Sequence, residues 1–192
     1  MPRLTRPLIL RHALPMVDAD GDVSMRKLAS SLSVTPMALY RHYPGKDALL
    51  ADIVEEKSRE LDLPEPLEDP VADTVQTALY LHDFLVERPW MIRLIATARL
   101  ASPRGFAFAR RFLDAAGRAG RGEAEAFVFY RTVFATVLGL ATITARKNAE
   151  ADADPAEATD AVPAQLATRW GELDRATGPV EVLTTVAEIL RG

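Results

Sequence analysis

The sequence predicts an all-α protein in which an N-terminal helix-turn-helix precedes a larger helical domain. Apolar residues recur at helical spacing along almost the whole chain, and the alternating pattern of a β-strand is nearly absent. Prolines and glycines divide the chain into segments of helical length. The 192 residues, 48% of them hydrophobic, suffice for a small domain attached to a larger one.

Proline and serine mark the first two helices. The first begins near Pro7, because proline suits the first turn of a helix, and ends before Asp20. Pro15 lies inside it, lacks an N–H group and clashes with the preceding turn, so a kink or a late restart is expected. Ser24 is expected to cap the second helix, over about 25–32.

The third and fourth helices follow closely. Thr35 offers a capping oxygen and Pro36 a suitable first residue, so a short helix is expected over 36–42. The stretch "YPG" ends it, and the fourth helix begins near Lys46. Its inner face carries Leu49, Leu50, Ile53, Val54 and Leu61 at helical spacing.

A cluster of three prolines marks the domain boundary. The stretch "DLPEPLEDP" at 62–70 must end the fourth helix, so we expect one domain over 1–61 and another over 62–192. In the second domain, helices are expected at about 70–87, 90–101, 104–118, 123–147, 164–174 and 179–191. The acid-rich stretch 148–163 predicts a loop.

The formal net charge of −4 is unevenly distributed. Residues 1–46 hold seven Lys/Arg and three Asp, giving +4, and residues 47–192 hold the other 16 basic and 24 acidic residues, giving −8. A basic N-terminal quarter suggests a segment that faces a polyanion, although clustering by chance would give the same count.

The helices expected over 25–32 and 36–42 have the dimensions of a helix-turn-helix. The free N–H groups at the start of the second helix favour a phosphate. Its outward side chains Met37, Tyr40 and Arg41 can reach into a major groove, whereas Leu39 points back to hold the helix pair. We therefore expect this segment to bind double-stranded DNA.

The stretch "SMRKLASSLSVTPMALYRHYPGKDALL" resembles the DNA-binding domain of the tetracycline-repressor (TetR) family, and the likeness covers about residues 7–55. The shared pattern is S/T-M-R-x-L-A-x-x-L-x-V, then L-Y-x-H-Y/V, then G/N/S-K-x-x-L-L. The form "MALYRH" looks most similar to the subgroup that contains the tetracycline repressor itself. The resemblance implies a homodimeric regulator that leaves a pseudo-palindromic DNA operator when a small molecule binds. Repression is the commonest mode in the family, and activation of transcription is the alternative.

The resemblance also implies roles for individual residues. The predicted DNA-binding set is Ser24, Arg26, Lys27, Thr35, Pro36, Met37, Ala38, Tyr40, Arg41, His42 and Lys46. Phosphate contacts are implied for Thr35, Tyr40, His42 and Lys46, and contacts with base edges for Arg26, Pro36, Met37, Ala38 and Arg41. Arg26 is the best candidate for a bidentate contact with guanine. The alternative for Tyr40 and His42 is that they cover the junction between the first and fourth helices.

For the larger domain, the resemblance implies an effector site but carries no residues over. Polar and aromatic residues embedded in apolar helices are the candidates: His82, Trp90, Phe108, Phe112, Tyr130, Arg131 and Phe134. Such a pocket would suit a bulky, largely apolar molecule. The alternative is that His82 and the aromatic residues belong to the core.

The helix expected over 123–147 is apolar nearly all round and must be covered on more than one face. The helix over 179–191 offers a second apolar surface. We expect the two helices to pair with their two-fold mates in a four-helix dimer interface, the alternative being that they form the central core of a monomer.

Enzyme chemistry lacks its usual signatures. The histidines, at 12, 42 and 82, are far apart, cysteine is absent, and neither a glycine-rich phosphate loop nor G-x-S-x-G occurs. No metal, cofactor or disulfide is therefore expected. A signal peptide and an apolar run of membrane-spanning length are also lacking, so we expect a cytoplasmic protein. The rival function is a helical adaptor that binds a protein partner and keeps a vestigial DNA motif.

Overall fold

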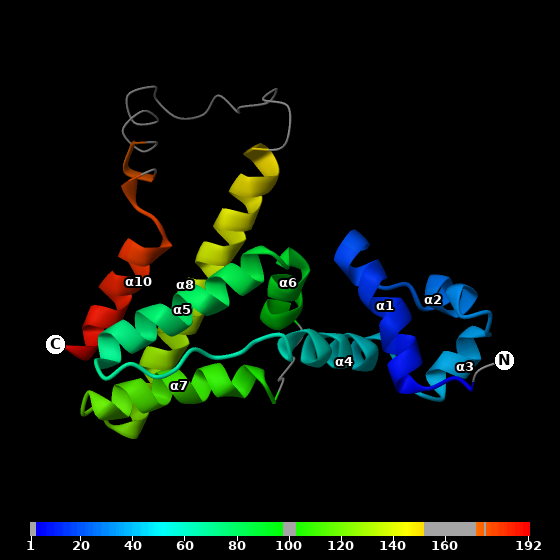
Figure 1. Ribbon diagram of the computed structural model, residues 1–192, viewed down its shortest axis with the longest axis horizontal. Coiled ribbons are helices and arrows are strands. Elements are labelled where there is room, and N and C mark those ends of the chain that lie inside the picture. Colours follow the sequence, from blue (N-terminus) through cyan, green and yellow to red (C-terminus); the bar gives the residue numbers. More distant parts are fainter. Residues whose placement is uncertain (1–2, 98–102, 152–171, 175) are drawn as a thin grey trace. The chain divides into compact units, whose positions relative to one another are not determined.

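The computed structural model describes residues 3–97, 103–151, 172–174 and 176–192, and the regular elements in these ranges are all helices (Figure 1). The predicted all-α class is confirmed. The chain divides into two compact units, Met1–Asp62 with Arg88–Ala107, and Leu63–Glu87 with Phe108–Gly192. The first unit thus takes in a segment from 88 to 107 that the sequence analysis assigns to the domain over 62–192.

The first unit contains α1 (Arg6–Asp20), α2 (Met25–Ser31), α3 (Pro36–Tyr40), α4 (Lys46–Ser58) and α6 (Pro89–Thr97). Helix α1 packs against α2 and α4, and α2 packs against α3. Side chains from α1, α2, α3 and α4 are fully or almost fully buried together: Ile9, Ala13, Val17, Leu28, Ala29, Leu39, Leu49 and Ile53. This core fixes the orientation of the short helix α3.

Helix α1 runs through Pro15 without a break, so the expected late restart is wrong. Proline removes the hydrogen bond to the carbonyl of Arg11 and crowds that group. Both Pro15 and Arg11 lie on the exposed side of α1, where water can satisfy the carbonyl. The helix ends at Asp20 and is capped by Gly21, whose positive φ of 68° is a conformation that glycine adopts without strain.

Helix α6 is anchored to the first unit by polar contacts. Trp90 Nε1 donates to Asp18 Oδ1 at 3.2 Å, and Arg93 Nη2 donates to the carbonyl of Gly21 at 2.9 Å. Arg88 forms an ion pair with Glu60 at 2.8 Å. These partners lie 28 to 72 residues away in sequence, and local periodicity therefore could not predict that α6 joins this unit.

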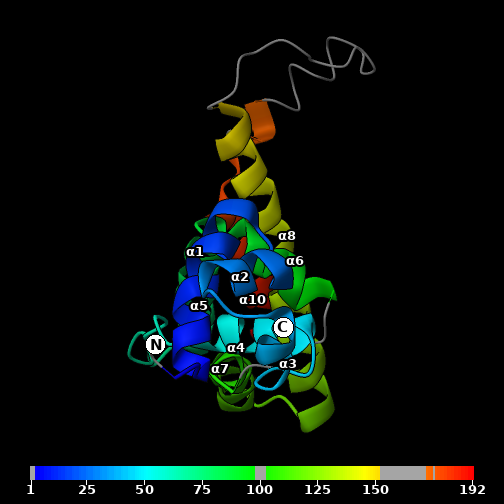
Figure 2. The same cartoon turned by 90° about the vertical axis from the view of Figure 1, so that its right-hand side faces the viewer.

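The second unit contains α5 (Pro70–Val86), α7 (Gly105–Arg118), α8 (Glu123–Ala151), α10 (Pro179–Ala187) and the short 3₁₀ helix η1 (Glu188–Leu190). Helix α5 packs against α8 and α10, which also contact each other. The last turns of α8 project beyond α5 (Figures 1 and 2). Residues 148–151 continue α8, contrary to the loop predicted there, and most of the helix expected over 164–174 lies outside the described residues.

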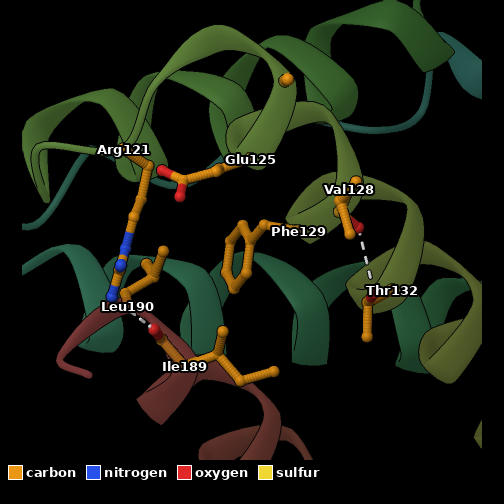
Figure 3. Close-up of a pocket in the computed structure, with 8 residues that line it drawn as sticks. Arg121, Glu125, Val128, Phe129, Thr132, Ile189 and Leu190 are labelled. Carbon is orange, nitrogen blue, oxygen red and sulfur yellow. Dashed lines mark hydrogen bonds between the residues drawn. The ribbon is translucent and has the colours of Figure 1, made fainter.

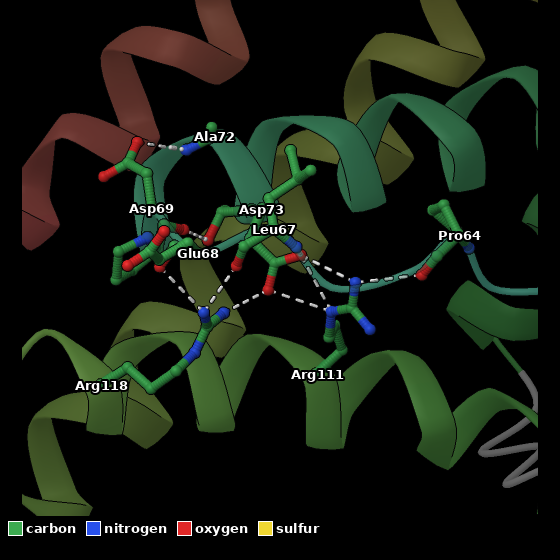
Figure 4. A network of polar contacts seen from close by, with 10 residues as sticks. Pro64, Leu67, Glu68, Asp69, Ala72, Asp73, Arg111 and Arg118 are labelled. Carbon is green, nitrogen blue, oxygen red and sulfur yellow. Dashed lines mark hydrogen bonds and ion pairs between the residues drawn. The ribbon is translucent and has the colours of Figure 1, made fainter.

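A buried aspartate ties α5 to α7 and to the segment before α5 (Figure 4). Asp73, fully buried, accepts hydrogen bonds from Arg111 at 2.8 to 3.0 Å, from Arg118 and from the Leu67 amide at 3.1 Å. The two guanidinium groups also donate to backbone carbonyls of residues 64, 67 and 68. Residues 64–68 are thereby fixed along α7.

Candidate nucleic-acid interface

The turn between α2 and α3 sets the position of the candidate recognition helix. Ser24 Oγ accepts from the Lys27 amide at 3.4 Å, which confirms its predicted role as the cap of α2. The amide of Val34 donates to the carbonyl of Ala29 at 3.0 Å, and Ser33 adopts a positive φ of 55°. The fully buried side chain of Leu39 then anchors α3 to the core of the first unit.

The outward side of α3 carries large side chains that are open to solvent. Met37 is 69% exposed and Tyr40 is 44% exposed. Burying such residues is favourable, so leaving them open indicates a surface with another use. Of the other predicted DNA-binding residues, the exposed ones are Ser24, Arg26, Lys27, Thr35, Pro36 and Arg41, and the half-buried ones are Ala38, His42 and Lys46. All eleven can still be reached by a ligand.

Thr35 plays a different part from the one expected. It has the extended backbone of a capping residue, but its side chain makes no capping hydrogen bond, so the predicted capping oxygen is wrong. The Thr35 carbonyl instead accepts from the Ala38 amide at 2.9 Å. The exposed hydroxyl remains open to another acceptor or donor.

Tyr43 and Arg6 support the end of the recognition segment from behind. Tyr43 is 1% exposed, and the Arg6 guanidinium lies 5.1 Å from the centre of its ring. Burial, and then the nearby Asp52 carboxylate, raise the pKa of Tyr43 well above its usual range. Arg6 also donates from Nε and Nη2 to the His42 carbonyl at 3.2 and 3.0 Å. Arg6 could not be identified from local sequence patterns, because its partner lies 36 residues away.

Three aspartates around the α1–α2 turn each meet a different lysine. Asp22 Oδ2 accepts from Lys46 Nζ at 2.6 Å, and this hydrogen bond lowers the pKa of Asp22. Looser ion pairs join Asp20 to Lys27 at 3.8 Å and Asp18 to Lys57 at 3.6 Å. Two of the predicted DNA-contacting lysines are thus paired with acids of the same unit.

The predicted effector residues are divided between the units. Trp90 is buried in the first unit against Asp18. In the second unit His82, Phe108 and Phe112 are buried, Tyr130 and Phe134 are half-buried, and Arg131 is exposed. His82 Nε2 lies 3.2 Å from the Thr144 hydroxyl, a contact that links α5 to α8, and Nδ1 lies 2.8 Å from Asp83 of the same helix α5.

Helix α8 and the C-terminal segment expose a set of large apolar side chains: Phe127, Val128, Ile143, Val180 and Ile189. By length and composition alone, residues 123–150 could also cross a membrane, with 28% of the apolar window buried. A core helix of a soluble protein passes the same test. The exposed apolar side chains indicate that another surface covers α8.

Shallow grooves follow the same helices. One groove of about 380 Å³ lies between the start of α8 and η1, with Val128, Phe129 and Ile189 on its walls (Figure 3). At its edge, Arg121 donates to the Ile189 carbonyl at 2.8 Å. A second groove of about 440 Å³ lies between Leu140 and Val182, and a third of about 420 Å³ lies beside Phe127. None of these three is lined by a predicted effector residue.

Similarity to known protein families lies in the helix-turn-helix segment. Residues 21–53, which span α2, α3 and most of α4, match the model of the bacterial regulatory proteins of the tetR family. Over 143 residues the chain is 31% identical to an HTH-type transcriptional regulator of Saccharopolyspora erythraea, covering 72% of this chain and 60% of the relative. It is 28% identical over 106 residues to the HTH-type transcriptional repressor DrrR1 of Streptomyces coeruleorubidus, covering 53% and 39%. The chain thus spans less than two thirds of either relative.

Solved structures share the fold. A structure of BioQ with its natural double-stranded DNA operator has a TM-score of 0.67 and 25% identity, covering 77% of this chain and 92% of that one. A structure of TetR-Q116A from Acinetobacter baumannii AYE in complex with minocycline has a TM-score of 0.68 and 22% identity, with 99% of each chain covered. An N-terminal helix-turn-helix unit followed by a helical unit is therefore the architecture of this chain.

Proposed function

We propose that this chain is a transcriptional regulator of the TetR family, a ligand-responsive repressor that binds a DNA operator through α2, α3 and the start of α4. One observation carries the proposal: the large side chains of α3 are open to solvent while Leu39 and Tyr43 hold the helix from behind. The relatives are named as transcriptional regulators, which are not enzymes.

The chemistry of this face suits a DNA duplex. Arg26 and Arg41 are exposed and can donate paired hydrogen bonds to guanine, whereas Met37 can contact thymine methyl groups. Thr35, Tyr40 and Lys46 can donate hydrogen bonds to phosphates, which position the protein without reading sequence. Direct base contacts should therefore come from α2 and α3, and salt dependence should come mainly from lysine and arginine.

We further propose that two copies of the chain associate through α8 and α10. The exposed apolar residues Val128, Ile143, Val180 and Ile189 support this, since a partner copy would remove them from water. A two-fold dimer would present two recognition helices to a pseudo-palindromic operator, with half-sites about 34–36 Å apart. The same dimer would cover the apolar side chains that α8 exposes along its length.

The effector in this proposal is a small, largely apolar molecule held in the second unit, and the protein works in the cytoplasm. Phe108, Phe112 and His82 supply an apolar and aromatic environment with one polar group. On α5, Thr77 Oγ1 is buried and has no hydrogen-bond partner among the described residues. Because buried polar atoms are normally hydrogen-bonded, Thr77 is a candidate for a polar contact with the effector.

Helix α6 offers a route by which the effector could change operator affinity. In sequence α6 lies between α5 and α7, while its side chains Trp90 and Arg93 contact the end of α1. An effector that favours one arrangement of α5 and α7 would shift the population of the DNA-binding arrangement by the difference in its affinities.

The recognition segment "MALYRH" also supports a finer proposal, that the chain belongs to the subgroup of the tetracycline repressor itself. Compounds related to tetracycline are therefore the first effectors to test. Titrating the protein with them while following Trp90 and Trp170 fluorescence would reveal binding. An unchanged spectrum together with unchanged operator affinity would argue against this subgroup.

Selection of bound sequences from a pool of random duplexes tests the proposed function. Enrichment of a pseudo-palindrome with half-sites one helical turn apart is expected. Enrichment lost in Arg26→Ala but retained in Arg110→Ala, an exposed arginine of α7, would assign recognition to this face. Recovery of no preferred sequence would contradict the proposal and favour a protein-binding adaptor that uses the exposed face of α8.

A further inference from the structure

Lys46 is already occupied before any DNA arrives. Its Nζ lies 2.6 Å from Asp22 Oδ2, the shortest distance among the described ion pairs of the first unit. Lys46 is the first residue of α4 and, in the proposed function, one of the groups that contact phosphate. A carboxylate and a phosphate oxygen are equivalent partners for an ammonium group, so the two must compete for it.

The carboxylate of Asp22 is held in place by the turn that carries it. Oδ1 accepts from the Val23 amide at 2.7 Å, and Val23 is buried. One residue earlier, Gly21 has a left-handed backbone, and its carbonyl accepts from Arg93 at 2.9 Å. The acidic partner is therefore fixed on both sides, whereas Lys46 carries its charge on a flexible four-carbon stem that can turn toward another anion.

The pair also contributes little to folding. The Lys46 and Asp22 side chains are 41% and 58% exposed, and ion pairs so open to water add little stability. An interaction of this kind can be exchanged for a phosphate contact without loss of the fold. The neighbouring pair of Asp20 with Lys27 repeats the arrangement, with a longer distance of 3.8 Å and more exposure.

We propose that Asp22 is a functional residue of the DNA interface, which lowers the affinity for DNA by competing with a phosphate for Lys46. The proposal rests on the function proposed above. When DNA binds, Lys46 leaves Asp22 for a phosphate, and the freed carboxylate recruits a cation from solution. In each subunit, the exchange releases about one counterion fewer than a free lysine would release.

The effect is measurable as a slope. Each phosphate contact adds about 0.9 to the steepness of log K against log salt concentration. Asp22→Asn should therefore steepen the slope by about 0.9 per subunit, or about 1.8 for the proposed dimer, and, if the two proteins bind equally at 1 M salt, tighten binding of the dimer about 60-fold at 0.1 M salt. Asp20→Asn should act in the same direction but more weakly, because its pair with Lys27 is longer.

Asp47→Asn is the matched control. Asp47 lies beside Lys46 in the first turn of α4, is exposed, and has no ion-pair partner in the part of the chain that the structure describes. Its substitution removes the same charge from nearly the same place. A general electrostatic effect would alter both variants alike, whereas competition for Lys46 predicts a larger change in Asp22→Asn.

The experiment is a salt series of fluorescence-anisotropy titrations with a selected operator duplex and a scrambled duplex of equal length. A steeper slope and tighter binding in Asp22→Asn on the scrambled duplex, absent when Lys46→Ala is added, would support the competition. Unchanged binding of DNA by Asp22→Asn would overturn the competition. Weaker binding would also overturn it, because it would show that Asp22 positions Lys46 for DNA. Equal affinity of wild type for both duplexes would instead contradict the proposed operator recognition, and binding to neither would overturn both proposals.

Discussion

Replacing Asp73 by asparagine tests the polar network that ties α5 to α7. The substitution keeps the size of the side chain but removes the charge that faces Arg111 and Arg118. Breaking a buried ion pair by removing one partner costs about 3 to 5 kcal/mol, because the remaining charge loses its compensation. Arg118 is 37% exposed, so water offsets part of its loss, and we expect about 3 kcal/mol for Asp73→Asn.

Urea denaturation followed by circular dichroism, at a fixed protein concentration, would measure the loss in the free energy of unfolding. For a chain of this length a loss of about 3 kcal/mol should lower Tm by about 6 to 12 °C. Asp114→Asn is the control, because its pair with Arg110 on α7 is exposed, and it should change stability by less than about 0.5 kcal/mol. A loss below about 1 kcal/mol in Asp73→Asn would show that the two arginines are satisfied without the carboxylate, contrary to this prediction.

Three further predictions concern the DNA-binding unit. Leu39→Ala should cost about 2 to 5 kcal/mol of stability in denaturation, whereas Met37→Ala, at an exposed site, should leave stability within about 0.5 kcal/mol and weaken operator binding in a titration. Ser24→Ala should cost about 1 kcal/mol through loss of a cap, whereas Thr35→Ala should cost less, because its side chain makes no capping bond; equal losses in denaturation would contradict this. The pKa of Asp22 is lowered in the folded protein. The Asp22 carboxylate therefore contributes to stability above its ordinary pKa of 3.8, and this contribution is lost as pH falls through its pKa in the folded protein. An NMR titration that places the pKa of Asp22 at or above 3.8 would contradict its ion pair with Lys46.

The sequence was most informative where structure depends on neighbours in the chain. Ser24 was identified as a cap because a serine before an apolar helical pattern has a local meaning. Leu39 was correctly assigned to the core by its position on the short helix. The start of α5 at Pro70 followed from a proline cluster in the same way.

The sequence was least informative where partners are distant. In the sequence, Asp73 is an acidic residue in the first turn of a helix, a common position for one. Its ion pairs with two arginines, 38 and 45 residues away, form only in the folded chain. Arg111 and Arg118 are two turns apart on one face of α7, which was the single available signal. Asp22 lies 24 residues from Lys46 in sequence, so local patterns could not predict their pair.

The most direct test of the account compares the affinity of the wild-type protein for its selected operator and for a scrambled duplex at one physiological salt concentration. Specific regulators bind their sites about 10³- to 10⁷-fold more tightly than other DNA. A ratio in this range, reduced by Arg26→Ala through weaker operator binding, is expected if α2 and α3 recognise the operator. A ratio near one, with both duplexes bound alike, would contradict operator recognition by α2 and α3.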